Sequence, residues 1–304
     1  MTGAALPSVS IVIPTYQRPE RIARCLESLR ALEHPRELLE VVVVEDGGPT
    51  DQLADLRARD FGDLRVRFLG QPHSGPAIAR NLGAREATGE LLAFTDDDCC
   101  PRPDWISRLL EVRDGQARTV VGGHTINALG SNAFSAASQS LVTYITRYGQ
   151  RVGAPFFASN NILIPRDLFL ELGGFDETFP LAGGEDRELC DRLNHHGIPQ
   201  LYAPEALIDH YHQLSGRAYW RQHFRYGRGA YQYHLARVSR RGTSLVEEYG
   251  RMVRDMDITF YTGLIRWPFQ DDEPRPLRTS LLLLWSQVPN TLGFFAERLT
   301  TRSR

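Results

Sequence analysis

Apolar segments with strand and helix periodicity alternate through the first hundred residues of this 304-residue chain. Residues 9–14 form an apolar run that predicts a buried strand stopped by a proline, and apolar side chains at helical spacing follow over residues 22–29. Because strands that alternate with helices form parallel sheets covered on both faces, we predict an α/β fold with a mostly parallel central sheet flanked by helices. The other predicted elements are strands at 39–44 and 66–69, helices at 50–59 and 75–87, and a strand that begins at Leu91.

Three consecutive carboxylates, Asp96, Asp97 and Asp98, end the apolar run that begins at Leu91. At the carboxyl end of a strand they would lie at the edge where open α/β sheets bind their ligands. Their charges repel one another, and a cation that prefers oxygen ligands, magnesium or manganese rather than zinc, would offset this repulsion. The pattern predicts a metal site, and the alternative is an acidic turn exposed to water.

A second acidic turn, Glu45 and Asp46 followed by two glycines, comes at the end of the strand at 39–44. Because parallel strands end at the same edge of a sheet, we expect this turn to lie near the aspartates, together with the helix start at Gly75 and its Arg80. A nucleotide fits such a crevice, with an acid on its base or ribose and a cation on its phosphates. The alternatives are that Asp46 only forms a turn and that Arg80 makes a weak surface ion pair.

Composition excludes some classes of function. The chain carries 35 basic and 37 acidic residues, a formal charge of -2, so nothing in its overall charge favours nucleic acid as a partner. Its four cysteines show neither metal-ligand nor disulfide spacing, which is typical of reduced thiols. Residues 1–7 lack the pattern of a secretion signal, and we therefore expect a cytoplasmic protein.

Five motifs, in this order, resemble those of family 2 glycosyltransferases, and the resemblance extends over about residues 8–230. It implies a GT-A-type, Rossmann-like fold, a nucleotide-sugar donor, a divalent cation (Mg²⁺ or Mn²⁺) held by the D-x-D acids, and inversion at the anomeric carbon. The motifs are SIVIPTY at 10–16, VVEDG at 43–47, GPAIARNLG at 75–83, FTDDD at 94–98 and GGED at 183–186.

By this resemblance Asp98 binds the metal directly, Asp96 supports the metal or the ribose, and His210 completes the metal site, with His212 a weaker candidate. Glu45 stands where the family usually has aspartate, which leaves the donor base less certain. A uridine diphosphate donor is favoured, and thymidine and guanosine nucleotides stay open. The residues implied to contact the nucleotide sugar are Pro14, Thr15, Tyr16, Arg18, Asp46, Arg80, Asp96, Asp97, Asn161, Gln222 and Arg225.

The acids Glu185 and Asp186 follow two glycines and open a predicted helix. Inverting sugar transfer needs one general base to take the proton of the acceptor hydroxyl. The Glu-Asp pair of the family implies that Asp186 is this base and that Glu185 orients the acceptor or the loop. The alternative is that both acids only stabilise the start of the helix, by about 0.3 to 1 kcal/mol each.

Residues 222–226 resemble the Q-x-x-R-W signature of processive relatives, with Gln222 and Arg225 in place and Tyr226 instead of tryptophan. Arg225 and Arg228 are candidates to neutralise the departing diphosphate. The alternative is an amphipathic helix with its arginines in water.

We expect a catalytic domain at 1–240 and a C-terminal helical extension at 241–304. Within the extension, the apolar stretch at 277–295 is interrupted by polar residues and is too short to span a membrane. We expect it to pack on the catalytic domain, to pair two subunits as a homodimer, or to lie at the inner face of a membrane.

Two other classes of function stay open. A sugar-1-phosphate nucleotidyltransferase also needs a nucleotide site with metal-binding acids, but it should carry a glycine-rich loop after the first strand, where this chain has residues 14–18, PTYQR. A non-catalytic nucleotide-sugar-binding protein would keep the fold and lose the base, whereas Glu185 and Asp186 are both present.

Overall fold

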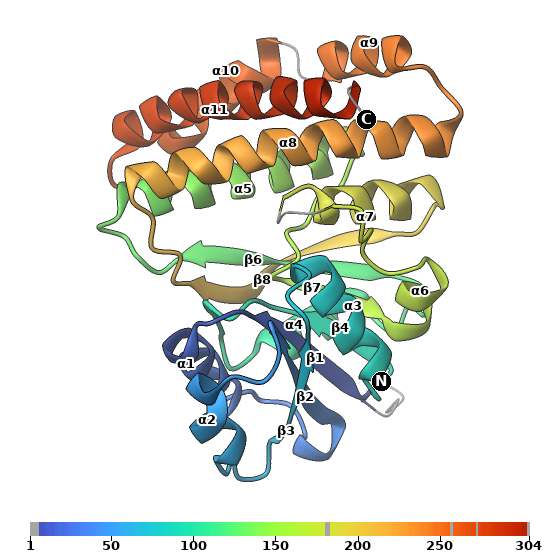
Figure 1. Ribbon diagram of the computed structural model, residues 1–304, viewed down its shortest axis with the longest axis vertical. Helices are drawn as coiled ribbons and strands as arrows, with labels where there is room; N and C mark the ends of the chain where they lie inside the picture. The colour runs from blue at the N-terminus through green and yellow to red at the C-terminus, as the bar shows by residue number, and fades with distance from the viewer. Residues whose placement is uncertain (1–5, 180–182, 256–257, 272, 303–304) are drawn as a thin grey trace. The chain divides into compact units, whose positions relative to one another are not determined.

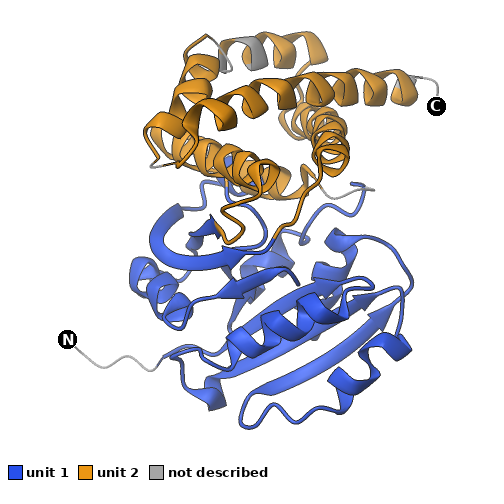
Figure 2. Cartoon of the chain, turned by 90° about the vertical axis from the view of Figure 1, so that its left-hand side faces the viewer, with its two compact units in different colours: residues 1–126, 157–180, 192–211 blue, residues 127–156, 181–191, 212–304 orange. Residues whose placement is uncertain are grey.

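The computed structural model describes residues 6–179, 183–255, 258–271 and 273–302, so most of the N-terminal segment discussed above lies outside it. The chain divides into two compact units (Figure 2). Unit 1 comprises residues 1–126, 157–180 and 192–211, and unit 2 comprises residues 127–156, 181–191 and 212–304. In these compact units two earlier stretches of the chain fold with the C-terminal helices, and the division into a catalytic domain and an extension at residue 240 stays a prediction.

Unit 1 is built on a sheet that has eight strands within the described residues (Figure 1). Their spatial order is β3-β2-β1-β4-β7-β6-β8-β5, and the first four in this order pair in parallel. The strands are β1 (Val9–Thr15), β2 (Leu39–Asp46), β3 (Arg65–Gln71), β4 (Leu91–Phe94), β5 (Cys99–Pro101), β6 (Val120–Asn127), β7 (Ile162–Pro165) and β8 (Gln200–His210).

The α/β fold class is confirmed, and parallel pairing is confined to the half of the sheet that the first hundred residues form. Strand β7 pairs antiparallel with both β4 and β6, and β5 pairs antiparallel with β8. The first strand continues through Pro14 to Thr15. Strand β4 pairs only with residues 9–12 of β1, so Pro14 lies beyond that ladder and its missing N–H leaves no gap in it.

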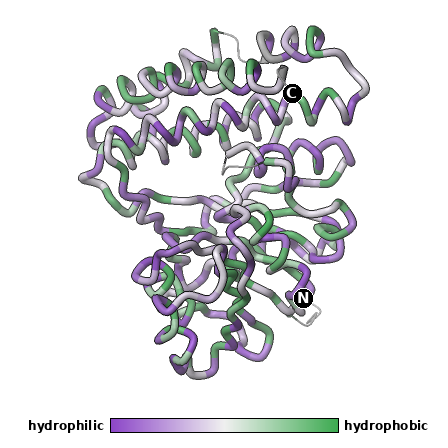
Figure 3. The backbone as a smooth tube through the Cα atoms, in the orientation of Figure 1, coloured by the Kyte–Doolittle hydropathy of each residue, from purple (hydrophilic) through white to green (hydrophobic). Residues whose placement is uncertain are grey.

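Alternate residues of β1 and β2 face opposite sides of the sheet, as the period of a strand requires. Val41 and Val43 belong to a large apolar cluster with Leu26 of α1, whereas Val42 and Val44 pack with Ala79 of α3 on the other side. Every residue of β1, β2 and β4 is buried, which explains their continuous apolar runs. Figure 3 shows this hydrophobic colour gathered along the strands of unit 1.

Short helices belong to unit 1. The predicted helix at 50–59 is split into a 3₁₀ turn, Asp51–Leu53, and the short helix α2. The helices are α1 (Pro19–Leu29), α2 (Ala54–Ala58), α3 (Pro76–Glu86), α4 (Trp105–Arg113) and α6 (Arg166–Glu171), and a further 3₁₀ turn is Arg36–Leu38.

Unit 2 is helical, and its two longest helices, α8 and α11, lie side by side (Figure 1). Tyr219 of α8 stacks on Trp285 of α11 with ring centroids 5.8 Å apart, and its hydroxyl donates to the carbonyl of Leu282. Helix α7 begins in unit 2, and its last four residues belong to unit 1. The helices are α5 (Ala133–Val152), α7 (Glu185–His195), α8 (Gly216–Arg241), α9 (Leu245–Asp255), α10 (Ile258–Arg266) and α11 (Pro276–Arg302), with a 3₁₀ turn at Trp267–Phe269.

Membrane spans were expected to be absent. Among the described residues, none of the helices combines the length and the apolar character needed to cross a bilayer.

Candidate active site

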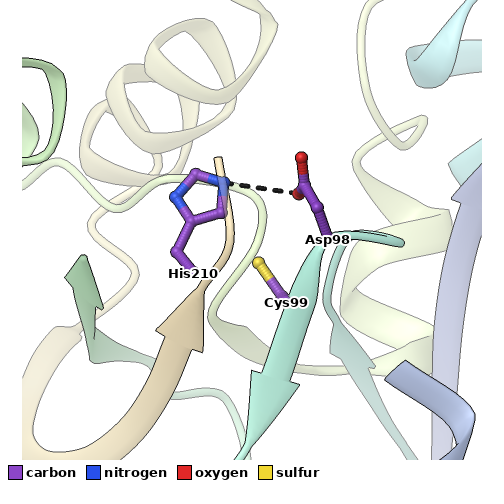
Figure 4. Close-up of side chains that lie close together, drawn as sticks. All are labelled: Asp98, Cys99 and His210. Carbon is purple, nitrogen blue, oxygen red and sulfur yellow. Dashed lines mark ion pairs between the residues drawn. The ribbon is translucent and has the colours of Figure 1, made fainter. Parts of the chain in front are cut away.

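Three side chains of unit 1 form a compact group of potential metal ligands (Figure 4). Atoms of Asp98, Cys99 and His210 that can bind a metal all lie within 4.8 Å of one another, and His210 Nε2 is 3.3 Å from Asp98 Oδ1. Ligand atoms about 2.0 to 2.3 Å from a common ion lie at comparable separations from each other. The group therefore fits a divalent ion, and it contains two of the predicted ligands, Asp98 and His210.

The pairing of β5 with β8 brings this group together. Cys99 lies directly opposite His210 in the antiparallel register, and the amide of Tyr211 donates to the carbonyl of Asp98 at 2.8 Å. Residues opposite each other in an antiparallel pair project to the same face of the sheet. Burial raises the pKa of the Cys99 thiol, so a metal that bound the sulfur would have to displace its proton.

Each of the three aspartates is paired with an arginine, whereas the sequence predicts that a metal cation offsets their charge. Arg80 is buried, and its guanidinium also lies 5.6 Å from the ring centroid of Phe175, so it is not the weak surface pair considered above. The three pairs are Arg80 with Asp96 at 2.5 Å, Arg18 with Asp97 at 3.2 Å and Arg21 with Asp98 at 2.8 Å.

The three aspartates differ in their surroundings. Asp97 is buried and accepts a hydrogen bond from Thr15 Oγ1 at 2.8 Å. Burial raises its pKa to about 6, against the charge of Arg18 and with the added repulsion of Asp98. Asp96 is the most exposed of the three and lies outside the compact ligand group. A direct role for Asp96 in metal binding stays a prediction.

Asp46 holds the loop that connects β3 to α3. Its carboxylate accepts hydrogen bonds from Gln71 Nε2 and from the backbone amides of Ser74 and Gly75, at 2.7 to 2.9 Å, and His73 Nδ1 lies 2.9 Å from Oδ2. Burial opposes ionisation, but the hydrogen bonds outweigh it and lower the pKa of Asp46. Because a carboxylate offers about four lone-pair sites, these donors use its full capacity.

Tyr16 presents an aromatic surface beside this loop. Its ring stacks on that of His73, with centroids 4.2 Å apart and planes 18° from parallel, and it lies against the backbone of Gly47. A Cβ at Gly47 would come within 3.0 Å of the Tyr16 ring. Tyr16 and His73 are both exposed, so a ligand ring can reach them from the solvent.

Asn161 is buried, and its amide is used within the protein. Oδ1 accepts from Trp105 Nε1 at 2.8 Å, and Nδ2 donates to the carbonyls of His124 and Ala206. The contacts of Asn161 are therefore structural, and its predicted contact with the donor stays a prediction.

The two acids that open α7 lie in unit 2 and interact with nearby backbone. Glu185 Oε2 accepts from the amide of Gly183 at 2.7 Å, and Asp186 Oδ1 accepts from the amide of Arg187 at 2.8 Å. Gly183 has a φ of 130°, and a Cβ at Gly229 of α8 would lie 1.7 Å from the Gly183 carbonyl oxygen. The loop that carries the acids is thus in backbone contact with α8, where only a residue without a side chain fits.

The signature residues of α8 lie near this contact. A Cβ at Gly183 would come within 2.8 Å of the Tyr226 ring, and Gln222 Nε2 donates to Tyr226 Oη at 2.8 Å. Arg225 is exposed and makes no ion pair with any residue that the structure describes. Arg228 instead pairs with Glu297 of α11 at 2.5 Å, so this guanidinium, a second candidate for the diphosphate, has a structural partner.

Ion pairs fix α7 against the end of α8. Arg240 pairs with both Glu188 and Asp191, and Asp191 also lies 3.3 Å from Arg237 Nε. Glu188 and Asp191 project from the same helix as Asp186. These pairs limit how the first turn of α7 can move relative to α8, and they hold Asp186 in a defined orientation within unit 2.

Comparison with known proteins identifies the family. The model of "Glycosyl transferase family 2" matches residues 10–173, more than half of the chain, and that of "N-terminal domain of galactosyltransferase" matches residues 140–215. The chain belongs to glycosyltransferase family 2. This family 2 glycosyltransferase is 26% identical to Glycosyltransferase AglE of Haloferax volcanii, over 78% of each chain. It is 33% identical to Validoxylamine A glucosyltransferase of Streptomyces hygroscopicus, over 68% of this chain and 56% of the relative.

Solved structures resemble this family 2 glycosyltransferase in fold. The mannosyltransferase PcManGT of Pyrobaculum calidifontis, in complex with GDP-Man and Mn²⁺, superposes with a TM-score of 0.60 at 20% identity, over 98% of this chain and 79% of the other. The predicted GT-A-type fold is thereby confirmed. The chain spans about half the length of several curated relatives that it matches.

A buried histidine of this family 2 glycosyltransferase leads to a prediction on stability. His223 of α8 is fully buried between Tyr219 and Tyr226, and neither ring nitrogen has a hydrogen-bond partner among the described residues. Burial lowers its pKa to about 3, and a positive charge on His212 would lower it further. The unfolded chain therefore binds a proton below pH about 6.5 that the folded chain does not, and stability falls as pH falls.

We expect a His223→Phe variant to lose stability less steeply than the wild type between pH 6 and pH 4, by about 1.4 kcal/mol per pH unit. Urea unfolding at a series of pH values measures this slope. Burial also lowers the pKa of His234, to about 4. Because His234 is present in both proteins, it contributes equally to the pH dependence of stability in each. Equal slopes for the two proteins would contradict the prediction.

The sequence analysis missed three residues of the site: Arg21, Cys99 and His73. Arg18 immediately precedes α1 and Arg21 lies in its first turn, so their closeness in the sequence could have indicated a second partner for the aspartates. Cys99 and His73 carry no local signal, because each acquires its neighbours only through the fold.

Proposed function

We propose that this chain transfers a sugar from a nucleoside-diphosphate donor to a hydroxyl acceptor, with inversion at the anomeric carbon and in dependence on a divalent cation. The acceptor oxygen forms a bond to the anomeric carbon as the bond from that carbon to the diphosphate oxygen breaks. The acceptor proton passes to a carboxylate, and the nucleoside diphosphate leaves as an anion.

The observation that carries the proposal is the compact group of Asp98, Cys99 and His210, which adjoins Asp96 and Asp97 in the sequence, in a chain of this family. A divalent ion held there would supply positive charge to the diphosphate as it leaves. The relative PcManGT is described as a complex with GDP-Man and Mn²⁺, which supports the same kind of donor and manganese or magnesium as the ion.

We assign the general base to Asp186, on the resemblance of Glu185-Asp186 to the acid pair of the family. Glu185 is buried and bound to the backbone of Gly183, an arrangement suited to shaping the loop, whereas Asp186 is only half-buried. Arg225 is exposed without an ion pair among the described residues, so its guanidinium is available to stabilise a phosphate oxygen.

For the donor base we propose uracil. The ring of His73 stacks on Tyr16 and is hydrogen-bonded to Asp46 Oδ2. A base that stacked on the same face of Tyr16 would displace His73 and could donate to Asp46 Oδ2 in its place. The N3–H of uracil can donate to a carboxylate, and its single ring is closer in size to the displaced imidazole than a purine is. Asp46 thus contacts the base only after His73 has moved.

A panel of nucleotide sugars tests the proposal. UDP-glucose, UDP-N-acetylglucosamine, GDP-mannose and dTDP-glucose are each compared with the free nucleoside, with Mn²⁺ or Mg²⁺ and after chelation, by thermal unfolding and by release of the nucleoside diphosphate. A donor at about one hundred times its Kd stabilises the folded chain by about 2.7 kcal/mol. We expect the largest effect from a UDP-sugar with metal, and loss of the effect on chelation.

Other outcomes of this panel decide between the functions. Release of pyrophosphate from a nucleoside triphosphate and a sugar 1-phosphate would identify a nucleotidyltransferase. Tight donor binding without release of nucleoside diphosphate, with hydroxyl acceptors present, would favour a binding protein. Because the base must displace His73, a His73→Ala variant should bind the UDP-sugar more tightly than the wild type does, and weaker binding would contradict the proposed place of His73.

A further inference from the structure

The long C-terminal helix α11 presents apolar side chains to solvent. Eleven of its described side chains are exposed, and eight of these are apolar. Their exposed fractions lie between 38% and 69%, which is unusual for large apolar residues gathered on one surface. We call these eight residues the apolar face of α11: Leu277, Leu281, Leu284, Trp285, Val288, Leu292, Phe295 and Leu299.

The opposite side of α11, which packs in unit 2, is more polar than its exposed side. Thr279, Ser280 and Ser286 are buried there beside Leu283, and Glu297 is buried in its ion pair with Arg228. A helix at the surface of a water-soluble unit has the reverse pattern, with its apolar side chains inward. The pattern of α11 thus indicates that its outer side meets an apolar medium.

The charge of unit 2 points to the nature of that medium. Unit 2 contains 18 arginines and 12 acidic residues, a net charge of +6, whereas unit 1 contains 17 arginines and 25 acidic residues, a net charge of -8. Within the described part of α11 the one acid, Glu297, is buried, and Arg278 is exposed between members of the apolar face. A basic unit with an exposed apolar helix complements an anionic lipid surface.

The spacing of the apolar face speaks against a left-handed coiled coil with a second copy of the chain. From Leu277 to Leu299 its members advance by three or four residues, on average about 3.7 per turn when Trp285 is set aside, close to the 3.6 of a straight helix. Two helices that pair as a left-handed coiled coil instead repeat every 3.5 residues. The face therefore stays on one side of the helix over about 33 Å of its length.

We propose that the apolar face of α11 binds the surface of an anionic phospholipid bilayer. The leucines, Val288 and Phe295 lie among the upper acyl chains, Trp285 lies at the boundary with the headgroups, and the exposed Arg278 contacts the phosphates. This inference stands on α11 and on the charge of unit 2, and it does not depend on the proposed reaction.

Sedimentation with vesicles tests the proposal on the full chain. We compare vesicles of phosphatidylglycerol and phosphatidylcholine with vesicles of phosphatidylcholine alone, at low and high salt. We expect the protein to sediment with the anionic vesicles and to be released by high salt, and in wild-type protein brominated lipids should quench the fluorescence of Trp285. Loss of this quenching in Trp285→Phe assigns the signal.

A triple variant, Leu281→Gln, Val288→Gln and Leu292→Gln, changes only exposed positions, and we expect it to bind anionic vesicles at least about tenfold more weakly. Val152→Gln is the matched control, because Val152 is an exposed apolar residue of unit 2 outside α11, and it should bind as the wild type does. Circular dichroism checks that the variants are folded.

Three results would overturn the proposal. The first is wild-type protein that fails to sediment with anionic vesicles and shows no quenching by brominated lipids. The second is a folded triple variant that binds vesicles as well as the wild type does. The third is a dimer in solution that the triple variant loses, without binding of the wild type to vesicles, since a second copy would then cover the face.

Discussion

An Asp186→Asn protein is expected to lose about 10³-fold in kcat while it binds its donor as the wild type does. Asparagine keeps an Oδ1 that can accept from the amide of Arg187, so the local contact of the first turn of α7 survives. What is lost is the ability to take the acceptor proton. Steady-state transfer rates, with donor binding followed by thermal unfolding, measure both quantities.

Asp167→Asn is the matched control for this substitution. Asp167 lies in the first turn of α6, as Asp186 lies in the first turn of α7, and its side chain is fully exposed. If the acids only stabilise helix starts, both variants should lose about 0.3 to 1 kcal/mol of stability and neither should lose activity. An Asp186→Asn protein that transfers sugar at the wild-type rate would remove Asp186 from catalysis.

The half of the sheet that the first hundred residues form could be predicted from the sequence, because its signals are local. Strands β1, β2 and β4 are buried on both faces and are mostly apolar, two acids end β2, and three aspartates begin two residues after the end of β4. The reversal of direction at β7 has no such signal. A buried strand has the same composition whether its neighbour is parallel or antiparallel, so residues 162–165 do not reveal their direction.

The group of potential metal ligands could be predicted only in part from the sequence, for the same reason. Asp98 and His210 could be selected on chemistry and on family resemblance, but Cys99 becomes a candidate only because β5 places it opposite His210. A cysteine that follows a run of aspartates is otherwise a small buried hydrophobe. Likewise, the saturation of Asp46 by four donors depends on the path of the loop between β3 and α3.

The way in which the compact units exchange segments could not be predicted from the sequence. Helix α5 interrupts the chain between β6 and β7 and folds with α8 and α11. Its apolar and small residues, from Ala133 to Val152, are as compatible with an inserted loop as with a helix of a second unit. Only contacts with segments far apart in the sequence distinguish a loop from a helix of the second unit here. The periodic pattern of a helix does not reveal which segment the helix packs against.

Replacing Asp98 by asparagine should have an equally large effect, through the metal. Asp98 would supply the charged oxygen ligand in the group that it forms with Cys99 and His210, so we expect its loss to prevent metal binding and to lower kcat/KM by about 10³-fold or more. Arg21 then loses its partner at 2.8 Å and adds positive charge where the ion would lie. An Arg21→Gln variant, which keeps the carboxylate, should still bind metal.

Cobalt binding separates the loss of metal from the loss of activity. Co²⁺ bound to a thiolate gives an intense near-ultraviolet charge-transfer band. The wild type should show this band if Cys99 binds the ion. The Cys99→Ser variant should lose the band and keep the d–d bands of bound Co²⁺. Cys100→Ser is the matched control, because its half-buried side chain lies outside the ligand group.

Asp98→Asn should show no cobalt bands, and a spectrum equal to that of the wild type would exclude Asp98 as a ligand. An Asp98→Asn protein that still releases nucleoside diphosphate at the wild-type rate would contradict the metal-dependent reaction, whatever its spectrum.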